Sequence, residues 1–249
     1  MKRIVVVMPA YNAASTLVKT YEDIPKDLVS KVILVDDRSG DDTARLARTL
    51  GLEVFEHPKN RGYGGNQKTC YRMALEAGAD VVVMLHPDYQ YDATRIPAMV
   101  QPILDGKADL VLGSRLLGGG ALRGGMPFYK YLANRFLTTV ENWAFGTRLS
   151  EMHTGFRAYS RRLLETIPFH LNSEDFVFDS EVIAQTVAMG FPITEIEVPT
   201  RYFPEASSIN FLRSTVYGLS TLKVVGRYLL HRCKLRNSLC FQPIPPVSE

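Results

Sequence analysis

The chain has 249 residues, of which 46% are hydrophobic and 22% charged, and its formal net charge is +3. This size suits one α/β domain with an appendage, and the composition is that of a globular protein with a sizeable core. A net charge this small gives no reason to expect a nucleic-acid partner. The three cysteines lack metal-ligand spacing, which argues against a disulfide framework and fits a reducing compartment.

The N-terminus leads directly from Lys2 and Arg3 into an apolar run, which leaves no room for a signal peptide. No segment has the roughly 20 apolar residues that are needed to span a bilayer. We therefore expect a cytoplasmic protein whose contact with a membrane is peripheral.

Four apolar runs, separated by helical patterns, are typical of buried parallel strands; they cover residues 4–8, 31–35, 81–85 and 110–112. Polar or turn residues follow each run. Ligands of open α/β sheets bind at the carboxyl ends of the strands. Four such ends together indicate a nucleotide site.

The first two strand ends carry the candidate base and ribose contacts. Pro9, Tyr11 and Asn12 follow the first run, where Pro9 and Tyr11 can shape and stack on a base. Asp36 and Asp37 follow the second run and can accept a hydrogen bond from a base or a ribose hydroxyl. The alternative for these two acids is helix capping, because the following residues suit a helix N-terminus.

A glycine-rich segment, with Asn60, Gly62 and Gly65, precedes a helical run. Glycines allow the backbone to come close to a diphosphate at a helix N-terminus. An ordinary glycine-rich turn is the alternative.

The segment after the third strand carries His86, Asp88 and Gln90. Side chains in extended backbone alternate, so these three can converge on one divalent cation. The alternative is a strand exit in which Pro87 and Asp88 only form a turn. Imidazole is a poor ligand for Mg²⁺ and suits borderline ions better, and a histidine that only packs is the competing interpretation.

Taken in order, three motifs resemble the signatures of family 2 glycosyltransferases, and best those of the polyprenyl-phosphate (dolichyl-phosphate mannose synthase-like) subgroup: Pro9-Ala10-Tyr11-Asn12, Val35-Asp36-Asp37-x-Ser39-x-Asp41-x-Thr43 and Asn60-Arg61-Gly62-Tyr63-Gly64-Gly65-Asn66. The resemblance covers roughly residues 1 to 203. It implies a GT-A fold, which is a Rossmann-like, mixed and mostly parallel sheet with helices on both faces. It also implies a nucleoside-diphosphate sugar donor, a divalent metal (Mn²⁺ or Mg²⁺) and inversion at the anomeric carbon.

The resemblance also implies roles for single residues. Asp88 and Gln90 match the family's metal-contact pattern, whereas His86 stands where the family has Asp. Arg115 resembles the arginine that faces a donor or acceptor phosphate. The apolar positions of the helix expected over residues 126–145 repeat at i, i+4, and in the resembling enzymes this helix lies beside the membrane. Core packing is the alternative for this helix, and a rim salt bridge is the alternative for Arg115.

In the second half, Arg157 follows a turn that resembles the family's acceptor side, and it is a candidate for binding the acceptor phosphate. Asp175 is the candidate general base if the acceptor is an alcohol; the acidic cluster around it could instead cap a helix. Arg201 belongs to a segment resembling the loop that closes over the diphosphate. Ser208 matches that loop, and Asn210 departs from it.

The region from residue 206 to 248 has six basic and no acidic residues, and its apolar residues keep helical spacing. This pattern suits a helix in a membrane interface, or one that binds a partner subunit in a homo-oligomer. We expect three regions: a GT-A domain at 1–203, an acceptor loop and basic amphipathic helix at 204–236, and a disordered tail at 237–249.

The resulting hypothesis is inverting transfer of a hexose, mannose or glucose, from a nucleoside-diphosphate sugar to a polyprenyl phosphate at the cytoplasmic face of a membrane. Transfer to a hydroxyl of a saccharide or lipid is the alternative reaction. A non-catalytic nucleotide-sugar-binding protein is the alternative of another class, because the first metal-binding Asp is missing.

Overall fold

The computed structural model of the chain describes residues 2–122, 124–199, 201 and 211–245. Within this part the strands form one sheet in the order β3-β2-β1-β4-β6-β5-β7, in which β6 runs antiparallel to both neighbours and the other pairs are parallel. The predicted mixed, mostly parallel sheet is confirmed. The strands are β1 (Ile4–Ala10), β2 (Lys31–Asp36), β3 (Glu53–Glu56), β4 (Val81–Met84), β5 (Leu110–Ser114), β6 (Arg157–Ser160) and β7 (Ile193–Glu197).

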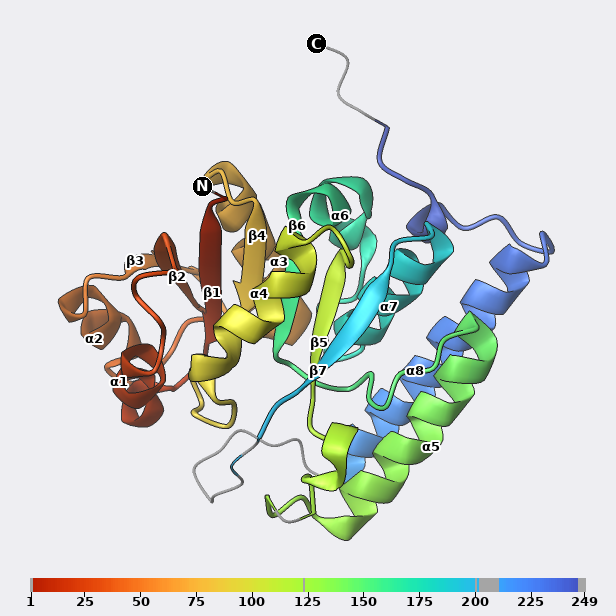
Figure 1. Cartoon of the computed structure of the whole chain (residues 1–249), viewed down its shortest axis with the longest axis horizontal. Helices are drawn as coiled ribbons and strands as arrows, with labels where there is room; N and C mark the ends of the chain where they lie inside the picture. The colour runs from red at the N-terminus through yellow and green to blue at the C-terminus, as the bar shows by residue number, and fades with distance from the viewer. Residues whose placement is uncertain (1, 123, 200, 202–210, 246–249) are drawn as a thin grey trace.

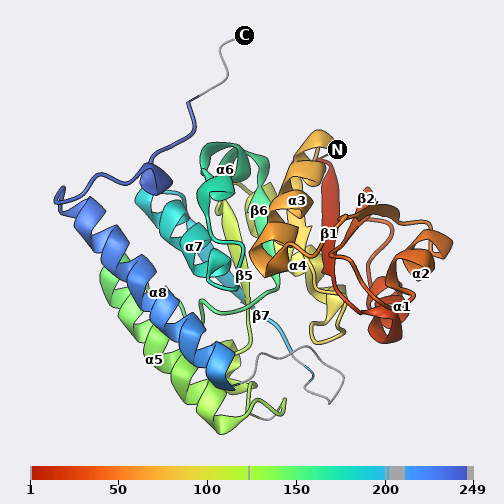
Figure 2. The same ribbon diagram turned by 180° about the vertical axis from the view of Figure 1, so that it is seen from behind.

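Helices cover both faces of this sheet (Figures 1 and 2). Alternate side chains of β1 therefore enter two apolar cores: Val5 and Val7 face α3 and α7, while Val6 and Met8 face α1 and α4. Burial on both faces explains why the central strands are continuously apolar. The α-helices are α1 (Ala14–Glu22), α2 (Thr43–Thr49), α3 (Gly62–Glu76), α4 (Ile96–Leu104), α5 (Phe128–Phe145), α6 (Arg161–Thr166), α7 (Phe178–Ala188) and α8 (Phe211–Arg232); short 3₁₀ helices are η1 (Ala93–Arg95), η2 (Leu117–Gly119), η3 (Phe169–Leu171) and η4 (Leu239–Phe241).

The helices α5 and α8 lie side by side at one end of the sheet (Figures 1 and 2). The rings of Phe145 and Tyr228 meet edge to face at 4.9 Å, and α8 also packs on α7. Val224 and Val225 of α8 belong to the same core as the sheet residues. The helix is therefore part of the folded body. In the part of the chain that is described, no helix is both long and apolar enough to cross a membrane.

The disordered tail expected from residue 237 is wrong for residues 237–245. Phe241 is 4% exposed and packs edge to face on Tyr228. The Ile244 amide donates to the Thr166 carbonyl at 2.8 Å. One buried aromatic ring thus holds this segment against the body, which its proline content did not reveal.

Candidate active site

Two adjoining cavities lie along the carboxyl ends of the central strands. The larger, of about 730 Å³, opens where β1 and β2 end. The smaller, of about 250 Å³, lies beside the first half of α5 and α8. The same side chains form part of both walls, namely those of Tyr63, His86, Asp88, Phe176 and Tyr217. A ligand in one cavity can therefore contact a ligand in the other.

The larger cavity is lined by most of the residues expected to bind a nucleotide. Pro9, Tyr11, Asn12, Asp37 and Asn60 all contribute to its wall. The Tyr11 ring is 59% exposed, so its face is available for stacking. Asn12 has a positive φ of 52°. Its amide donates to Ser39 Oγ at 2.9 Å, and its Oδ1 accepts from the Gly40 amide at 2.8 Å.

The two neighbouring aspartates have different surroundings. Asp36 does not line the larger cavity: it is buried, and its carboxylate accepts from the Ser39 amide at 2.9 Å and from the Ser39 hydroxyl. Asp36 closes the turn at Ser39 and does not cap α2, which begins at Thr43, so helix capping by Asp36 is wrong in this structure. Its contact with a nucleotide stays a prediction. Asp37 lines the cavity, but its carboxylate accepts from the Arg61 and Gly62 amides at 2.7 and 2.9 Å. It fixes the loop that precedes α3.

The glycine-rich segment packs against protein. A Cβ on Gly64 would lie 2.5 Å from the Ser173 carbonyl oxygen, and one on Gly62 would lie 2.8 Å from that of Glu174. The Gly64 amide donates to the Glu174 carbonyl at 2.8 Å. A Cβ on Gly65 would meet Arg61. Gly64 and Gly65 line neither cavity and allow α3 to pack on the segment before α7, so the expectation that Gly65 brings the backbone to a diphosphate is not met here. Gly62 lines the larger cavity, and its contact with a diphosphate stays a prediction.

The segment expected to hold a metal is a turn, so the predicted extended alternation is wrong. Strand β4 ends at Met84, and Tyr89 has a φ of +59°. The Asp88 carboxylate accepts from the Gln90 amide at 3.1 Å, and the Pro87 carbonyl accepts from Thr16 Oγ1. His86, Asp88 and Gln90 nevertheless all line the smaller cavity. The turn brings together the residues that extended backbone was expected to align.

Burial shifts the pKa values of two side chains in this turn. It raises the pKa of the Asp88 carboxyl, and His86 and Arg115 oppose this only in part. Burial also lowers the pKa of the His86 imidazole, which favours the neutral ring. A partly buried carboxylate in a cavity wall favours a nearby cation. Among the described residues no three His, Cys, Asp or Glu side chains form a metal cluster. The donor set fits a cation that is held by one carboxylate, an imidazole or amide, and the phosphate oxygens of a ligand.

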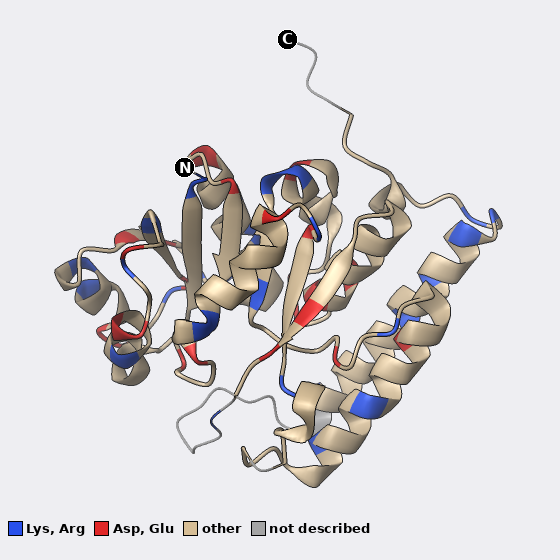
Figure 3. Ribbon diagram, viewed as in Figure 1, with Lys and Arg blue, Asp and Glu red and all other residues tan. Residues whose placement is uncertain are grey.

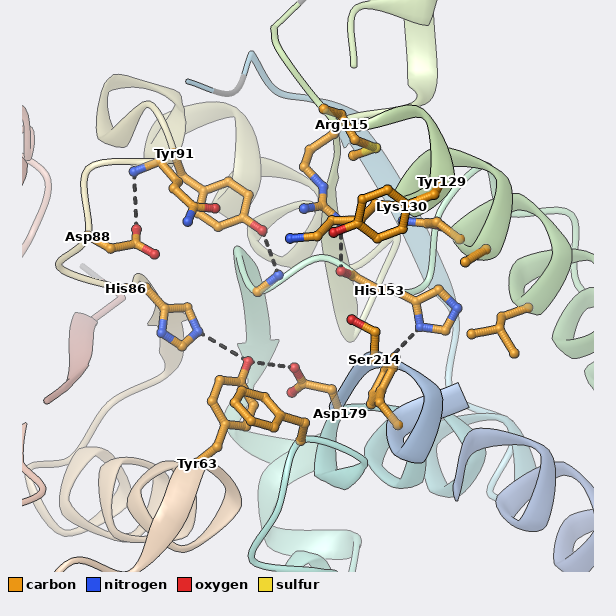
Figure 4. A pocket seen from close by; sticks show the side chains of 18 residues that line it. Tyr63, His86, Asp88, Tyr91, Arg115, Tyr129, Lys130, His153, Asp179 and Ser214 are labelled. Atoms are coloured by element: carbon orange, nitrogen blue, oxygen red, sulfur yellow. Dashed lines mark hydrogen bonds between the residues drawn. The ribbon is translucent and has the colours of Figure 1, made fainter. Parts of the chain in front are cut away.

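His86 also belongs to a hydrogen-bonded chain (Figure 4). The Tyr63 hydroxyl donates to Asp179 Oδ2 at 2.7 Å and lies 3.3 Å from His86 Nε2. The Tyr63 and His86 rings stack with centroids 5.4 Å apart. Tyr63 lies inside the glycine-rich motif, but its link to residue 179 depends on a contact between α3 and α7 that the sequence does not indicate.

The smaller cavity has a cationic wall. Arg115 lines it, and its guanidinium donates to the buried Glu151 carboxylate, with Nε 2.8 Å from Oε1. Lys130, which the sequence analysis did not assign to the site, lines the same wall; burial and the nearby Arg115 charge lower the pKa of its ammonium. Apolar side chains of α5 complete the wall, among them Ala133 and Leu137. The wall therefore suits an anion that is joined to an apolar group.

Two of the predicted catalytic residues, Arg157 and Asp175, differ in their accessibility. Arg157 is fully buried, and it donates to the carbonyls of Thr154, Met152 and Asp179. Its assignment to the acceptor phosphate is wrong, because its guanidinium is inside the core. Asp175 is exposed and lines the larger cavity.

Arg201 lies beside the turn that carries Asp88 and Gln90. Its amide donates to the Gln90 carbonyl at 2.9 Å, and its guanidinium lies 4.5 Å from the centre of the Tyr89 ring. It does not line either of the two cavities. Ser208 and Asn210, which carry the rest of the loop resemblance, are outside the described residues.

The first three positions of the predicted stripe on α5 (residues 128, 132, 136 and 140) face outward, whereas Val140 packs against the core. Phe128, Leu132 and Phe136 are 64%, 52% and 60% exposed, and Trp143 is 75% exposed. Core packing, the alternative for this stripe, is therefore wrong for these positions. On α8, Val216 and Leu219 and several basic residues are also exposed, and Figure 3 shows blue segments along both helices with little red between them. Single exposed apolar residues are ordinary, but a row of them marks an interaction surface.

Comparison with known proteins identifies the same family as the sequence motifs do. A family model described as "Glycosyl transferase family 2" matches residues 5–167. A dolichyl-phosphate hexose transferase of Haloferax volcanii is 28% identical over 222 residues, which cover 88% of this chain and 92% of the relative. A UDP-N-acetylglucosamine–dolichyl-phosphate N-acetylglucosaminyltransferase of Methanococcus voltae is 25% identical over 218 residues, covering 81% and 86%.

Among solved structures, the chain is similar to glucosyl-3-phosphoglycerate synthase from Mycobacterium tuberculosis in complex with Mn²⁺ and UDP-glucose. The TM-score is 0.70 and the identity 22%, over 95% of this chain and 81% of that one. At this identity the likeness shows the fold.

Proposed function

Because the chain belongs to glycosyltransferase family 2 and is a glycosyltransferase, we propose that it moves a hexose from a nucleoside-diphosphate sugar to a polyprenyl phosphate with inversion. The observation that carries this proposal is the pair of adjoining cavities with Asp88 in the wall between them. A donor in the larger cavity and a phosphate in the smaller one would meet at this residue.

The proposed binding of the sugar donor is based on the larger cavity. Its size suits a nucleoside diphosphate, since ligand cavities typically have volumes of about 300–1,000 Å³. Tyr11 offers a ring face for the base, and Asn60 and Asp37 line the same cavity. The diphosphate end would then point toward Asp88.

A divalent cation would be held by Asp88, with His86 or Gln90 and the diphosphate supplying further ligands. When bound, such a cation stabilises the negative charge of the leaving diphosphate. Because an imidazole favours borderline ions, we expect better activity with Mn²⁺ than with Mg²⁺, and His86→Asp should raise the relative Mg²⁺ activity. An unchanged ratio of the two initial rates would argue against ligation by His86.

The acceptor half rests on the smaller cavity. Lys130 and Arg115 offer positive charge, and the apolar side chains of α5 offer a surface for the first carbons of a polyprenyl chain. A phosphate is already an anion at neutral pH, so its oxygen can attack C1 without a general base. The task of these residues is to orient that oxygen in line with the leaving group.

A membrane surface is the natural place for such an acceptor. The row of exposed apolar residues on α5, together with the basic residues of α8, is typical of helices that lie in the membrane interface. We propose peripheral attachment through α5 and α8 at the cytoplasmic face. Residues from α8 line both cavities, so this attachment would bring the acceptor phosphate to the site.

The second reaction, transfer to a hydroxyl, is favoured by one observation: Asp175 is exposed and lines the larger cavity, where a base could act. The two reactions are separated by assaying purified protein with labelled UDP- and GDP-hexoses, Mn²⁺, and either a polyprenyl phosphate or the corresponding polyprenol. Transfer to the phosphate that survives Asp175→Asn supports the proposal. Transfer to the polyprenol alone, abolished by Asp175→Asn, would replace it with the second reaction.

The same assay tests the non-catalytic alternative. Neither transfer nor donor hydrolysis with any sugar nucleotide, from protein that still binds the nucleotide, would favour a binding protein.

A further inference from the structure

The imidazole of His86 is held in one orientation by its neighbours. Its Cδ2–Nε2 edge faces Gly155, where an added Cβ would come within 2.8 Å of Cδ2 and 2.9 Å of Nε2. One face of the ring stacks on Tyr63, with an angle of 11° between the planes. The Gly155 amide is itself fixed, since it donates to the Tyr91 hydroxyl at 2.9 Å. The ring therefore has little room to turn.

Hydrogen-bond directions then determine which nitrogen carries the proton. The Tyr63 hydroxyl has a single hydrogen, which it donates to Asp179 at 2.7 Å. The Asp179 carboxylate lies 3.6 Å from the Arg157 guanidinium, so it accepts and does not donate. Toward His86 Nε2, 3.3 Å away, the Tyr63 oxygen can therefore only accept. In a neutral His86 ring this contact is a hydrogen bond when the hydrogen is on Nε2, and that tautomer leaves the lone pair on Nδ1.

Figure 4 shows Tyr63 and Asp179 on one side of the His86 ring and Asp88 on another. Metal-bound histidines are commonly oriented in this way, by a hydrogen bond from the other ring nitrogen that leads to a carboxylate. We infer that Tyr63, Asp179 and Gly155 are positioning residues that hold His86 as its Nε2–H tautomer and present Nδ1 to a divalent cation bound with the diphosphate. This inference rests on the proposed function and assigns the residues that orient one ligand of its cation.

The tautomer of His86 can be determined in the absence of metal, sugar donor and acceptor. The test is nitrogen-15 NMR of the full chain with labelled histidine, at a pH where the ring is neutral, with the His86 signals assigned by their loss in His86→Gln. We expect a protonated Nε2 and an unprotonated Nδ1. A protonated Nδ1 would overturn the inference whether or not the protein transfers a sugar.

The role of Tyr63 is tested by Tyr63→Phe, which keeps the stacked ring and removes only the hydroxyl. We expect the two tautomers to coexist in this variant, while Tyr21→Phe, on α1, leaves the wild-type pattern unchanged. A single unchanged tautomer in Tyr63→Phe would overturn the positioning role. If Tyr63→Phe does not fold, Gly155→Ala provides a second test. Its added methyl group should displace the His86 ring and change the nitrogen-15 chemical shifts of His86.

The cation half of the inference is tested by pulsed electron paramagnetic resonance of the full chain with Mn²⁺ and UDP. We expect a nitrogen coupling in the wild type that His86→Asp abolishes. An Mn²⁺–UDP complex without that coupling would overturn the assignment of Nδ1 to the cation. A complex that shows the coupling but transfers no hexose to polyprenyl phosphate supports this inference while refuting the proposed function.

Discussion

Replacing Phe136 by Ser tests whether the exposed stripe of α5 enters a membrane. The Phe136 side chain is 60% exposed. With about 200 Å² for a phenylalanine side chain, roughly 120 Å² would leave water on full immersion. At ~25 cal/mol per Å², this burial contributes about 3 kcal/mol. Since about 1.4 kcal/mol corresponds to a tenfold change, Phe136→Ser should weaken vesicle binding by up to about 100-fold.

The assay is co-sedimentation with vesicles of phosphatidylcholine that contain a minor fraction of phosphatidylserine. Two further variants form a matched pair: Leu132 and Leu171 are 52% and 47% exposed, but only Leu132 lies on α5. Leu132→Ser should weaken binding to vesicles about fivefold, because about half of this side chain, and so about half of the transfer free energy of a leucine, would be buried in the membrane. Leu171→Ser, on η3, should have no effect. Equal behaviour of the two leucine variants, or wild-type binding by Phe136→Ser, would refute the membrane role of α5.

Three further predictions concern the site and its support. Asp88→Asn should abolish transfer yet raise the melting temperature at neutral pH. Burial raises the pKa of the Asp88 carboxyl in the folded protein, so the ionised carboxylate destabilises the fold at a pH above that pKa. The difference in melting temperature between variant and wild type should shrink as the pH falls through that pKa. A variant less stable than the wild type at neutral pH would contradict this. Lys130→Gln should lower kcat/KM for polyprenyl phosphate by about 10- to 100-fold, since a hydrogen bond to a charged group contributes about 1.5–3 kcal/mol, without changing donor affinity. Gly64→Ala should lower the free energy of unfolding by about 1–3 kcal/mol, through contact with Ser173, whereas Gly226→Ala, with open space around it, should not lower it.

The sequence predicted the fold and the family because both depend on local patterns. Continuous apolar runs such as residues 4–8 specify strands that are buried on both faces, and the position of each strand end locates the ligand side of the sheet. The family resemblance is confirmed by the match over residues 5–167. The antiparallel β6 carries no local signal of its direction, because strand direction is set by neighbours that are distant in sequence.

The functional roles of single residues were harder to predict where the side chain binds other groups of the protein. Arg157 looked like an anion ligand, but buried carbonyls occupy its guanidinium group. Arg115 keeps its place in the wall of the smaller cavity, although its guanidinium also binds Glu151. A sequence shows the charge of a residue and not the partner that neutralises it. Lys130 was missed for the opposite reason: it lies among apolar residues on α5, and only the packing of that helix brings it to a cavity wall.

The position of α8 would link the proposed membrane attachment to the proposed acceptor site in one helix. Its inner face packs Val224, Val225 and Tyr228 into the core, whereas Leu219 and Leu230 are exposed. A deletion of α8 would therefore expose core residues and could not separate membrane binding from folding, which is why single substitutions on the outer face are the informative variants. Because residues near the start of the same helix line both cavities, a membrane that holds its outer face would also restrict the motion of the cavity wall. Binding to vesicles should then lower the KM for the acceptor more than it changes kcat, which steady-state rates at increasing vesicle concentration can measure.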